Sequence, residues 1–438
     1  MSAERDPGRE GGFRPAIAAG AAGAEGSAAD GSSSGTRLDA AALISLQREV
    51  VETLAPLDRT PCSAGEREAA EWLAARLAEV EGVDVALEDE PSWGTFPPTA
   101  TGLGLLGLAG ATLVLRGRRA LGGLVALATL AGIVDEAHNG PRVLRRLVRR
   151  RRSTVNLIAC TGDRAAPCTL VVLAHHDAPQ TGMLYDQTLQ RRLFERAPGV
   201  LERFKTPLPQ WWFGLSGPLW SLLAALSGRR GLARGGLAVG VVGTLLIADI
   251  WRSETVQGAN DNLSGVAGLV GLAELLRRQP VPGLRVLLVS CGAEETLQDG
   301  IRAFLARHGD ELDPAHTAFV NLDTVGSPHL VLLEAEGPVR MEPYTAPWLR
   351  ELFAVHAERL GTPLLRGYRA RASTDSVIPS RAGYPTATLV SVTDWFVPAN
   401  YHLPSDVPAN LDYATVAETT RLVHEVAGAL PAALAEAR

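Results

Sequence analysis

The chain has 438 residues, of which 46% are hydrophobic and 21% are charged, and its formal net charge is -6. This length suits one large α/β domain with additions, or two to three average domains. The composition excludes the basic surface that nucleic-acid binding needs, so we expect no nucleic-acid partner. The four cysteines lie far apart without CxxC spacing, which argues against a thiolate zinc site and a disulfide framework.

The N-terminal segment, residues 1–38, is rich in Gly, Ala and Ser and has neither an apolar run nor a helical or strand period. We therefore predict a disordered tail over these residues. Residues 39–55 and 63–80 have the apolar spacing of amphipathic helices. Ser63 with Glu66 predicts a capping box at the start of the second helix.

Four apolar runs without a charged residue follow in two pairs. They cover residues 96–115 and 120–134 in the first pair, and 206–228 and 235–248 in the second. The first run of each pair has the roughly 20 residues that cross a ~30 Å hydrocarbon core, whereas the second runs, at about 15, are short for it. We therefore expect two membrane hairpins, spanning or re-entrant, at 96–134 and 206–250. Helices buried in a large soluble core are the alternative.

Two features indicate how these hairpins would lie in a membrane. Tryptophans near the ends of the second pair favour an interface position: Trp211, Trp212, Trp220 and Trp251. Arginines at 142, 145, 146 and 149–152 flank the first pair, against three in each connecting turn. The positive-inside rule therefore places the rest of the chain on the cytoplasmic side of the membrane. A solvated basic helix face is the alternative for these arginines.

Short apolar strands and amphipathic helices alternate along the rest of the chain. Strands are expected at 83–90, 156–160, 169–174, 284–290, 318–322 and 386–392, and helices at 264–278, 301–308, 348–360 and 412–437. This alternation predicts an α/β fold with a mixed, mostly parallel sheet sandwiched between helices. The two hydrophobic helical hairpins would be insertions in it.

Side chains that can bind metals follow several of these strands. They are His175, His176 and Asp177 after 169–174, Glu294 and Glu295 after 284–290, and Asp323 after 318–322. Asp261 precedes the helix at 264–278, and His402 lies in a later loop. Each alone has an ordinary explanation, such as a helix cap or a solvated acidic pair. Together, two histidines and several carboxylates at the carboxyl ends of strands form the mixed N/O set that zinc accepts.

Five segments resemble, in order and context, the motifs of the two-zinc aminopeptidase family, which is related to the glutamate carboxypeptidases. They are 174–177, 258–265, Glu294 and Glu295 with Gly300 and Phe304, 321–323, and 401–402. The resemblance covers about residues 39–95, 153–195 and 253–435. It implies a catalytic zinc peptidase domain built from 39–95, 153–205 and 252–438, with the hairpins in its loops.

The resemblance also implies the roles of the site residues. Two zinc ions per chain would be held by His175, Glu295, Asp323 and His402, with Asp261 bridging both ions. Glu294 would be the general base, and Asp177 would orient a ligating imidazole. His176 is expected to point away from the site as a structural residue. The peptide bond between Asp261 and Asn262 would be cis.

The implied function is that of a membrane-associated exopeptidase, an aminopeptidase that hydrolyses peptides. Its partners would be a peptide substrate and membrane lipid, while its oligomeric state stays open. One alternative is an acyl transferase like the glutaminyl cyclases, a group that uses one zinc on the same fold. The other is a catalytically dead membrane scaffold.

The sequence departs from the family beside the glutamate pair. Leu297, Gln298 and Ile301 replace the usual residues of a loop next to the substrate, so specificity is affected more than metal binding. Asp375 lies in a segment that only loosely matches a substrate-pocket motif. It is as readily explained as a turn residue.

Overall fold

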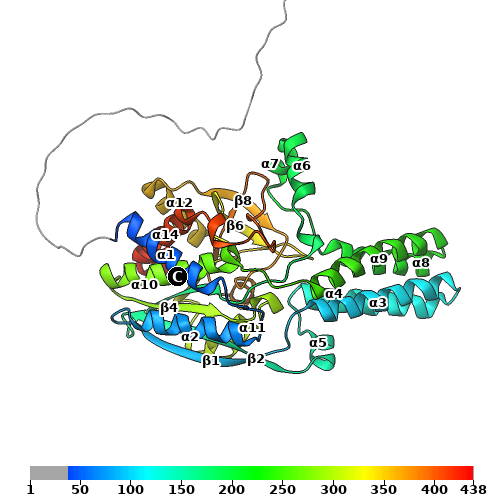
Figure 1. Cartoon of the computed structure of the whole chain (residues 1–438), viewed down its shortest axis with the longest axis horizontal. Helices are drawn as coiled ribbons and strands as arrows, with labels where there is room; N and C mark the ends of the chain where they lie inside the picture. Colours follow the sequence, from blue (N-terminus) through cyan, green and yellow to red (C-terminus); the bar gives the residue numbers. More distant parts are fainter. Residues whose placement is uncertain (1–37, 438) are drawn as a thin grey trace, which may run out of the picture. The chain divides into compact units, whose positions relative to one another are not determined.

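The computed structural model describes residues 38–437, so the tail expected at 1–38 lies outside the described residues except for Leu38. Within that range, one sheet has the strand order β1-β2-β4-β3-β5-β9-β6-β7, and β8 pairs with β6. Figure 1 shows this sheet with helices around it. The strands are β1 (Asp84–Ser92), β2 (Arg152–Gly162), β3 (Cys168–His175), β4 (Leu284–Cys291), β5 (Thr317–Leu322), β6 (His329–Glu336), β7 (Glu342–Pro343), β8 (Leu365–Ala370) and β9 (Thr386–Val392).

The centre of the sheet is parallel, since β3 pairs in parallel with β4 and β5, and β5 with β9. Antiparallel pairs flank this centre on both sides, at β1–β2–β4 and at β9–β6–β7. The mixed α/β fold with a parallel core is therefore confirmed. In such a sheet, the loops after the parallel strands meet at one edge, which is where ligand sites form.

Helices cover both faces of the sheet because successive strand residues point to opposite sides. Leu170 and Val172 of β3 belong to the main core, together with apolar residues of α1, α2, α10, α12 and α14. Val171 packs on the other face with Ile301 and Phe304 of α11. The helices are α1 (Ala40–Leu54), α2 (Ala64–Ala78), α10 (Ser264–Arg278), α11 (Asp299–His308), α12 (Pro347–Leu360) and α14 (Tyr413–Glu436).

Some elements have no counterpart in the sequence prediction. They include β6, β8, α5 (Val143–Val148), α6 (Thr188–Arg196), α7 (Pro198–Phe204) and α13 (Val377–Arg381). Strand β8 is mostly exposed and contains two arginines and Gly367, so it lacks the alternating apolar pattern that marks a strand. The three α-helices α5, α7 and α13 have seven residues or fewer, too few for a clear period.

The apolar runs form four helices that extend together from one side of the sheet domain (Figure 1). They are α3 (Pro97–Leu115), α4 (Arg119–Ala137), α8 (Trp212–Ser227) and α9 (Arg230–Arg252). We refer to them as the four-helix bundle. Among the described residues, α3, α4 and α9 are long and apolar enough to cross a membrane, judged by length and composition.

The expected lengths of the paired runs were wrong. The second members, α4 and α9, have 19 and 23 residues instead of about 15, because both helices take in charged residues at their ends. Helix α8 has only 16 residues and begins at Trp212. Pro207 and Pro209 lie just before it, and proline disfavours helical backbone at the residue that precedes it.

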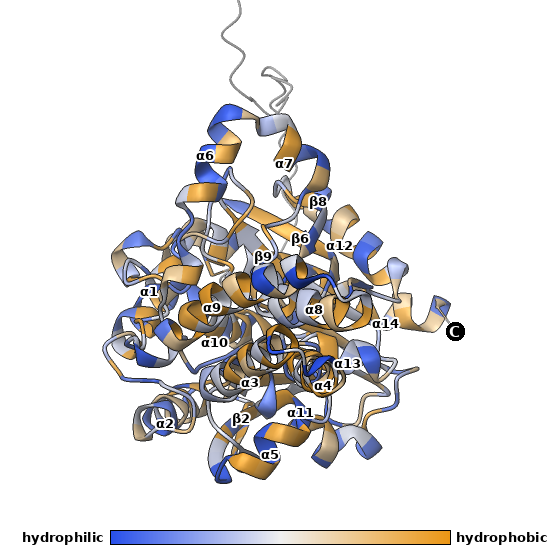
Figure 2. Cartoon of the chain, turned by 90° about the vertical axis from the view of Figure 1, so that its right-hand side faces the viewer, coloured by the Kyte–Doolittle hydropathy of each residue, from blue (hydrophilic) through white to orange (hydrophobic). Residues whose placement is uncertain are grey.

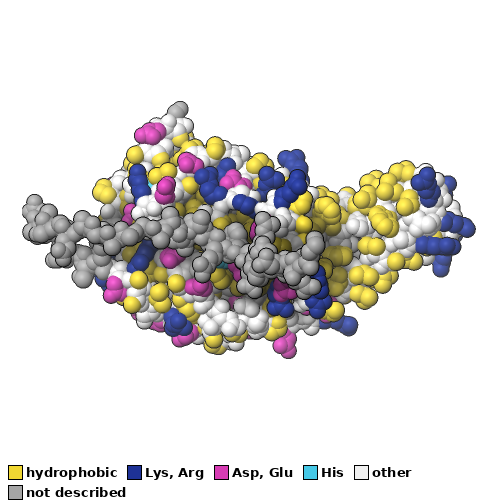
Figure 3. All heavy atoms as spheres, turned by 90° about the horizontal axis from the view of Figure 1, so that it is seen from above, with side chains coloured by type: hydrophobic (Ala, Val, Ile, Leu, Met, Phe, Trp, Pro, Cys, Tyr) yellow, Lys and Arg dark blue, Asp and Glu magenta, His cyan; other side chains and the backbone are white. Residues whose placement is uncertain are grey.

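Small residues bring the helices of the bundle close together, and large apolar residues point outward. A Cβ added to Gly217 of α8 would lie 2.7 Å from the Cα of Gly240 in α9. Leu124, Leu226 and Leu245 are 65%, 74% and 64% exposed. The bundle surface is accordingly apolar, with Lys and Arg gathered at its far end and where it meets the sheet domain (Figures 2 and 3).

This exposure shows that the buried-core interpretation of the hairpins was wrong. A contiguous apolar surface of this kind marks a membrane or protein interaction surface. Trp212 and Trp251 lie near helix ends, whereas Trp220 lies in the middle of α8 and gives no support to an interface position.

Candidate metal centre

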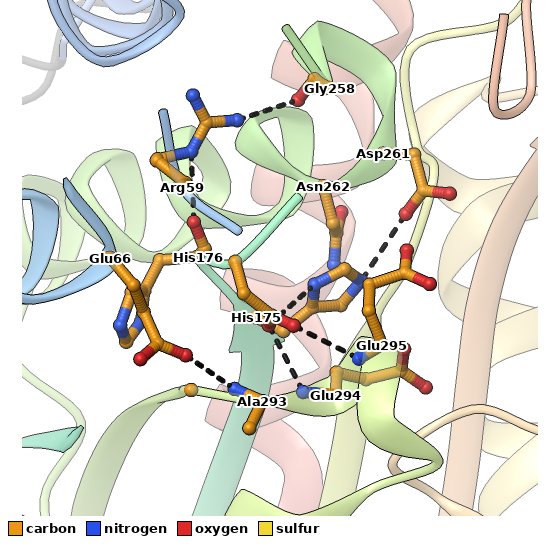
Figure 4. Close-up of polar contacts among 12 residues, drawn as sticks. Arg59, Glu66, His175, His176, Gly258, Asp261, Asn262, Ala293, Glu294 and Glu295 are labelled. Carbon is orange, nitrogen blue, oxygen red and sulfur yellow. Dashed lines mark hydrogen bonds and ion pairs between the residues drawn. The ribbon is translucent and has the colours of Figure 1, made fainter. Parts of the chain in front are cut away.

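The predicted metal-binding side chains meet at the carboxyl edge of the parallel strands. Figure 4 shows His175, Asp261, Glu294 and Glu295 of this group. His175 is the last residue of β3, and Asp323 follows β5 directly. Glu294 and Glu295 form a single 3-10 turn, η3 (Glu294–Thr296), three residues after β4. All of these donors are at least largely buried.

The other two donors come from loops that cover this edge. Asp261 lies in the irregular turn η2 (Ala259–Leu263) just before α10, and His402 lies in the loop after β9. The peptide bond between Asp261 and Asn262 is cis, as the resemblance implied. All five predicted ligands therefore come together, although they lie on segments far apart in the chain.

Asp261 lies between the two histidines. Its Oδ1 is 3.3 Å from Nε2 of His175, and its Oδ2 is 3.1 Å from Nε2 of His402. The same nitrogen of His402 is 3.5 Å from Oε1 of Glu295. One carboxylate thus offers one oxygen to each side, which is the arrangement that a ligand shared by two cations requires.

The donor set fits zinc. Three groups each place their ligand atoms within 4.8 Å of one another: His175 with Asp261 and Asp323, His175 with Glu294 and Glu295, and Asp261 with Glu295 and His402. Imidazole nitrogens and carboxylate oxygens are zinc's usual donors apart from thiolates. Burying so many carboxylates together is costly unless cations or protons compensate them.

The pKa shifts of these carboxyl groups reflect the cost of burying them together. Burial raises the pKa of Asp323 to about 7 and that of Glu295 well above its usual range, and the charge of Asp261 adds to both shifts. Burial would also raise the pKa of Asp261, but hydrogen bonds to His175 and His402 outweigh it and lower the pKa. Asp261 is therefore the carboxylate of the group that is most strongly held in its ionised form.

Glu294 is the buried carboxylate that the resemblance leaves free of metal. Burial raises its pKa well above the usual range, although the nearby His175 opposes the shift. The side-chain amide of Gln298 donates to Oε1 of Glu294 at 2.5 Å and to the carbonyl of Ser373 at 2.9 Å. The prediction treated Gln298 as a specificity residue; it contacts the expected general base directly.

Two further carboxylates hold the turn that carries the glutamate pair. The backbone N–H groups of Glu294 and Glu295 donate to the two oxygens of Asp177 at 3.0 and 2.9 Å. Oδ1 of Asp177 also lies 3.3 Å from Nδ1 of His175, as expected of a residue that orients the imidazole. Glu66 accepts from the N–H of Ala293, so its side chain helps to fix the same turn and not only the start of α2.

Sequence reasoning gave no role to two other residues near the site. Asp406 accepts from the N–H groups of Asn260 and Asp261 at 2.7 and 3.1 Å, which fixes the backbone around the shared carboxylate. Arg59 is fully buried and donates to the carbonyls of His176 and Gln257. The position of Asp406 shortly after His402 was the only available signal for it.

Two predictions concerned residues beside the ligands. His176 points away from the site, with Nδ1 2.9 Å from the hydroxyl of Ser290, as expected of a structural residue. Asp375 is fully buried, and burial raises its pKa to about 8. It lies in a turn, as one of the two interpretations expected, but it is buried rather than exposed to solvent.

The hairpins reach the metal centre in two ways. Four of the five predicted ligands line a cavity of about 110 Å³: His175, Asp261, Glu295 and Asp323. Its wall includes Pro207, Leu208 and Gln210 from the segment that leads into α8. The first hairpin instead ends in buried charges. Arg145 of α5 pairs with Glu136 of α4 at 2.5 Å and donates to the carbonyl of Thr296.

A second buried ion pair lies next to the first. Arg142 pairs with Asp299, the first residue of α11. Asp299 directly follows residues 292–298, which carry Glu294 and Glu295 and which we call the glutamate loop. Arg142, Arg145, Glu136 and Asp299 are each at most 6% exposed. The end of the first hairpin is therefore fastened to residues 296–299, directly after the glutamate pair.

Comparisons with known proteins agree with this architecture. A family model described as peptidase family M28 matches residues 242–427. An aminopeptidase from Aneurinibacillus sp. strain AM-1 is similar in structure, with a TM-score of 0.50, 13% identity, and coverage of 91% of this chain and 95% of that one. No curated protein sequence matches the chain.

Enzymes of two classes share the fold. A leucine aminopeptidase precursor from Bacteroides thetaiotaomicron has a TM-score of 0.52 at 14% identity and covers 90% of this chain and 97% of its own. A glutaminyl cyclase from an Acidobacteriales bacterium has a TM-score of 0.52 at 13% identity, with coverage of 93% and 99%. At such identities the likeness establishes the fold alone.

Proposed function

Because the chain belongs to a zinc aminopeptidase family, peptidase family M28, over residues 242–427, we propose that it is a membrane-associated metallo-exopeptidase that removes N-terminal residues from peptides. The observation that carries this proposal is the convergence of four donors on a fifth, Asp261, with the free carboxylate of Glu294 beside them. A scaffold that had lost catalysis would not need to keep this complete set.

In the proposed site, Asp261 would be shared by two zinc ions. His175 and Asp323 would complete the donors on one side of it, and Glu295 and His402 on the other. When bound, zinc would supply Lewis-acid polarisation of the peptide carbonyl and lower the pKa of a water molecule towards about 7. The rest of the chemistry falls to the side chains around it.

Glu294 would move the proton. Its Oε1 is occupied by the amide of Gln298, so the other oxygen is the one free to accept a proton from the attacking water. The same oxygen would then return the proton to the amine nitrogen that leaves, as a general base and acid does in turn. Asp177 would keep Glu294 in position through the backbone of the turn, and Gln298 through its side chain.

Membrane association through the four-helix bundle is the second part of the proposal. The exposed leucines of the bundle and the three helices of sufficient length support it. We propose that the sheet domain lies on the cytoplasmic side. Carbonate extraction would test the anchoring, and protease protection in sealed vesicles would test the side; release of intact protein by carbonate would contradict the anchoring.

The decisive experiment joins metal content to turnover. Detergent-purified protein would be analysed for zinc by mass spectrometry, and the release of amino acids from a peptide pool would be compared for wild type, Glu294→Gln and Glu295→Gln. We expect about two zinc per chain in wild type and Glu294→Gln, turnover in wild type only, and less zinc in Glu295→Gln.

The other outcomes point elsewhere. One zinc per chain, with cyclisation of N-terminal glutamine, would favour a glutaminyl cyclase-like acyl transferase. Absence of zinc and of turnover would favour a scaffold. Hydrolysis by Glu294→Gln near the wild-type rate would rule out Glu294 as the base.

A further inference from the structure

A second, larger cavity adjoins the metal centre. It measures about 500 Å³, which lies within the 300 to 1,000 Å³ typical of ligand pockets. The two cavities share part of their walls, namely Pro207, Leu208, Gln210, Val397 and Tyr401. A molecule in the larger cavity could therefore extend to the side of the metal ligands.

The lining of this larger cavity is mostly apolar. At the end away from the metal centre, its wall consists of Trp212, Phe213 and Trp220 of α8 and Val239 of α9. Asp186 is the one charged residue that lines it among those described. Such a surface favours apolar chemical groups. The guanidinium of Arg371 lies over the ring of Trp212, 5.7 Å from its centroid, but Arg371 lines the smaller cavity and not this one.

The cavity extends along the side of the bundle. Trp212 and Trp220 are eight positions apart on one helix, which corresponds to a rise of about 12 Å. An extended peptide advances about 3.3 Å per residue, so roughly four residues would fit along this stretch. Leu189 of α6 is 68% exposed and lines the cavity across from α8.

The wall between the two cavities is held in place by hydrogen bonds. The N–H of Leu208 donates to Oε1 of Gln190 at 2.9 Å, and the amide of Gln190 donates to the carbonyl of Trp395 at 2.8 Å. The segment before α8 is thus tied both to α6 and to the loop after β9. Such ties favour a binding surface that exists before the ligand arrives.

We propose that this cavity binds the apolar residues that follow the N-terminus of a peptide substrate, so that the substrate class is apolar peptides such as fragments of transmembrane helices. The inference rests on the proposed peptidase function, because continuity with the metal centre is what selects a peptide over a lipid chain. The substrate reaches the metal centre from the side of the bundle.

The test uses two hexapeptide amides with the same N-terminal Leu-Gly, followed by four leucines in one and four serines in the other. The full-length protein in detergent would be assayed for release of the first residue, and the ratio of kcat/KM values for the two peptides compared. We expect wild type to favour the leucine peptide at least about tenfold, as burial of one or two apolar side chains would give.

Variants test whether the preference for the leucine peptide arises in the larger cavity. Leu189→Gln and Trp212→Gln each change a half-exposed or exposed cavity residue, and we expect each to lower the ratio several-fold. Leu226→Gln is the matched control, since Leu226 is an apolar residue of α8 that is 74% exposed and does not line the cavity. This control should keep the wild-type ratio.

Each remaining outcome overturns a defined part of the proposal. Equal hydrolysis of both peptides by wild type would overturn the inference while leaving the peptidase function intact, and co-purified lipid would then identify a lipid chain as the occupant. If Leu226→Gln lowered the ratio equally, the preference would come from partition of the leucine peptide into the micelle, and the proposal would be overturned. Hydrolysis of neither peptide, together with none from the peptide pool, would overturn the proposed function itself.

Discussion

The metal centre and the four-helix bundle are built in opposite ways. In the metal centre, side chains that usually face water are buried, such as His175 and Asp261, which are 2% and 3% exposed. In the bundle, side chains that usually avoid water are exposed, such as Leu226. Buried carboxylates require cations or protons, and exposed leucines require an apolar surrounding. The comparison teaches that each region needs its own kind of partner, and we propose zinc for the one and lipid for the other.

The contacts that join the two regions are also of two kinds. The first hairpin is fastened to the glutamate loop by buried charges, through Arg145 with Glu136 and Arg142 with Asp299. The second hairpin joins through the cavity wall around Leu208. We therefore expect changes at the first junction to act on stability and catalysis together, and changes at the second to act on substrate choice.

The largest expected effect comes from breaking the charged junction. Arg145→Met removes the partner of the buried Glu136 and a donor to the carbonyl of Thr296. Removing one member of a buried ion pair typically lowers the free energy of unfolding by about 3–5 kcal/mol. We expect a clearly lower Tm in detergent and weaker turnover. Arg150→Met, at an exposed position five residues along, is the matched control.

A double variant sharpens the same test. Replacing both partners, in Arg145→Met with Glu136→Leu, leaves no unpaired charge, and exchanging a buried pair for apolar residues is often close to neutral. We expect the double variant to regain most of the lost Tm. If turnover also returns, the ion pair serves packing alone; if only Tm returns, the arginine positions the glutamate loop.

The next effect concerns the turn that carries the glutamate pair. Asp177→Asn keeps one acceptor oxygen, so one of the two N–H groups of Glu294 and Glu295 loses its partner. Changes to residues that support metal ligands typically cost about 10–100-fold in activity or metal affinity. The measurement is kcat/KM together with zinc content. Asp163→Asn is the control, since Asp163 also accepts a backbone N–H but lies in an exposed turn.

Much of the sheet domain could be predicted from the sequence because its signals are local. The helix at 264–278 was predicted with its observed bounds. The strand that ends at His175 is one residue longer at each end than predicted, and the strand before Asp323 begins one residue earlier. Apolar runs of this kind report burial directly. Since the metal donors follow those strands, the fold brings them together as soon as the strands pair.

The contacts that were missed depend on residues far apart in the sequence. Asp406 contacts the backbone of Asn260, and Arg145 contacts Thr296, both across about 150 residues. No period in a single sequence reports such pairs. The length of α9 was underestimated for a different reason, because the prediction stopped at charged residues, while a membrane helix can carry these at its ends.

A smaller effect is expected inside the bundle. Gly217→Ala places a methyl group 2.7 Å from the Cα of Gly240 and 3.1 Å from the carbonyl oxygen of Gly236. Overpacking of this kind costs about 1–3 kcal/mol, so we expect a lower Tm in detergent. Gly214→Ala is the matched control on the same helix, since nothing lies within 4 Å of its added Cβ. Equal Tm values for the two variants would show that α8 and α9 do not pack as described.

The smallest expected effect is a pH dependence to which the metal centre contributes. Burial raises the pKa of Asp323 to about 7, whereas an unfolded aspartate has a pKa of about 3.9. A carboxyl group whose pKa is higher in the folded state than in the unfolded state stabilises the folded protein at pH values below the unfolded pKa. This stabilisation is lost as the pH rises through the folded pKa. Chelator-treated protein should therefore have a lower Tm at pH 8 than at pH 5.5.

Two comparisons test whether this dependence of Tm on pH comes from the metal centre. Zinc should reduce it, because cations stabilise the ionised carboxylates that are costly without them, and metal ligands bind in their deprotonated form. Asp323→Asn should also reduce it in the chelated protein, since an amide does not titrate over this range. The bundle provides the internal reference, because its exposed leucines do not titrate. The pH dependence that remains would come from other buried acids, of which Glu66 and Asp375 are the first to examine, since burial raises the pKa of each to about 8.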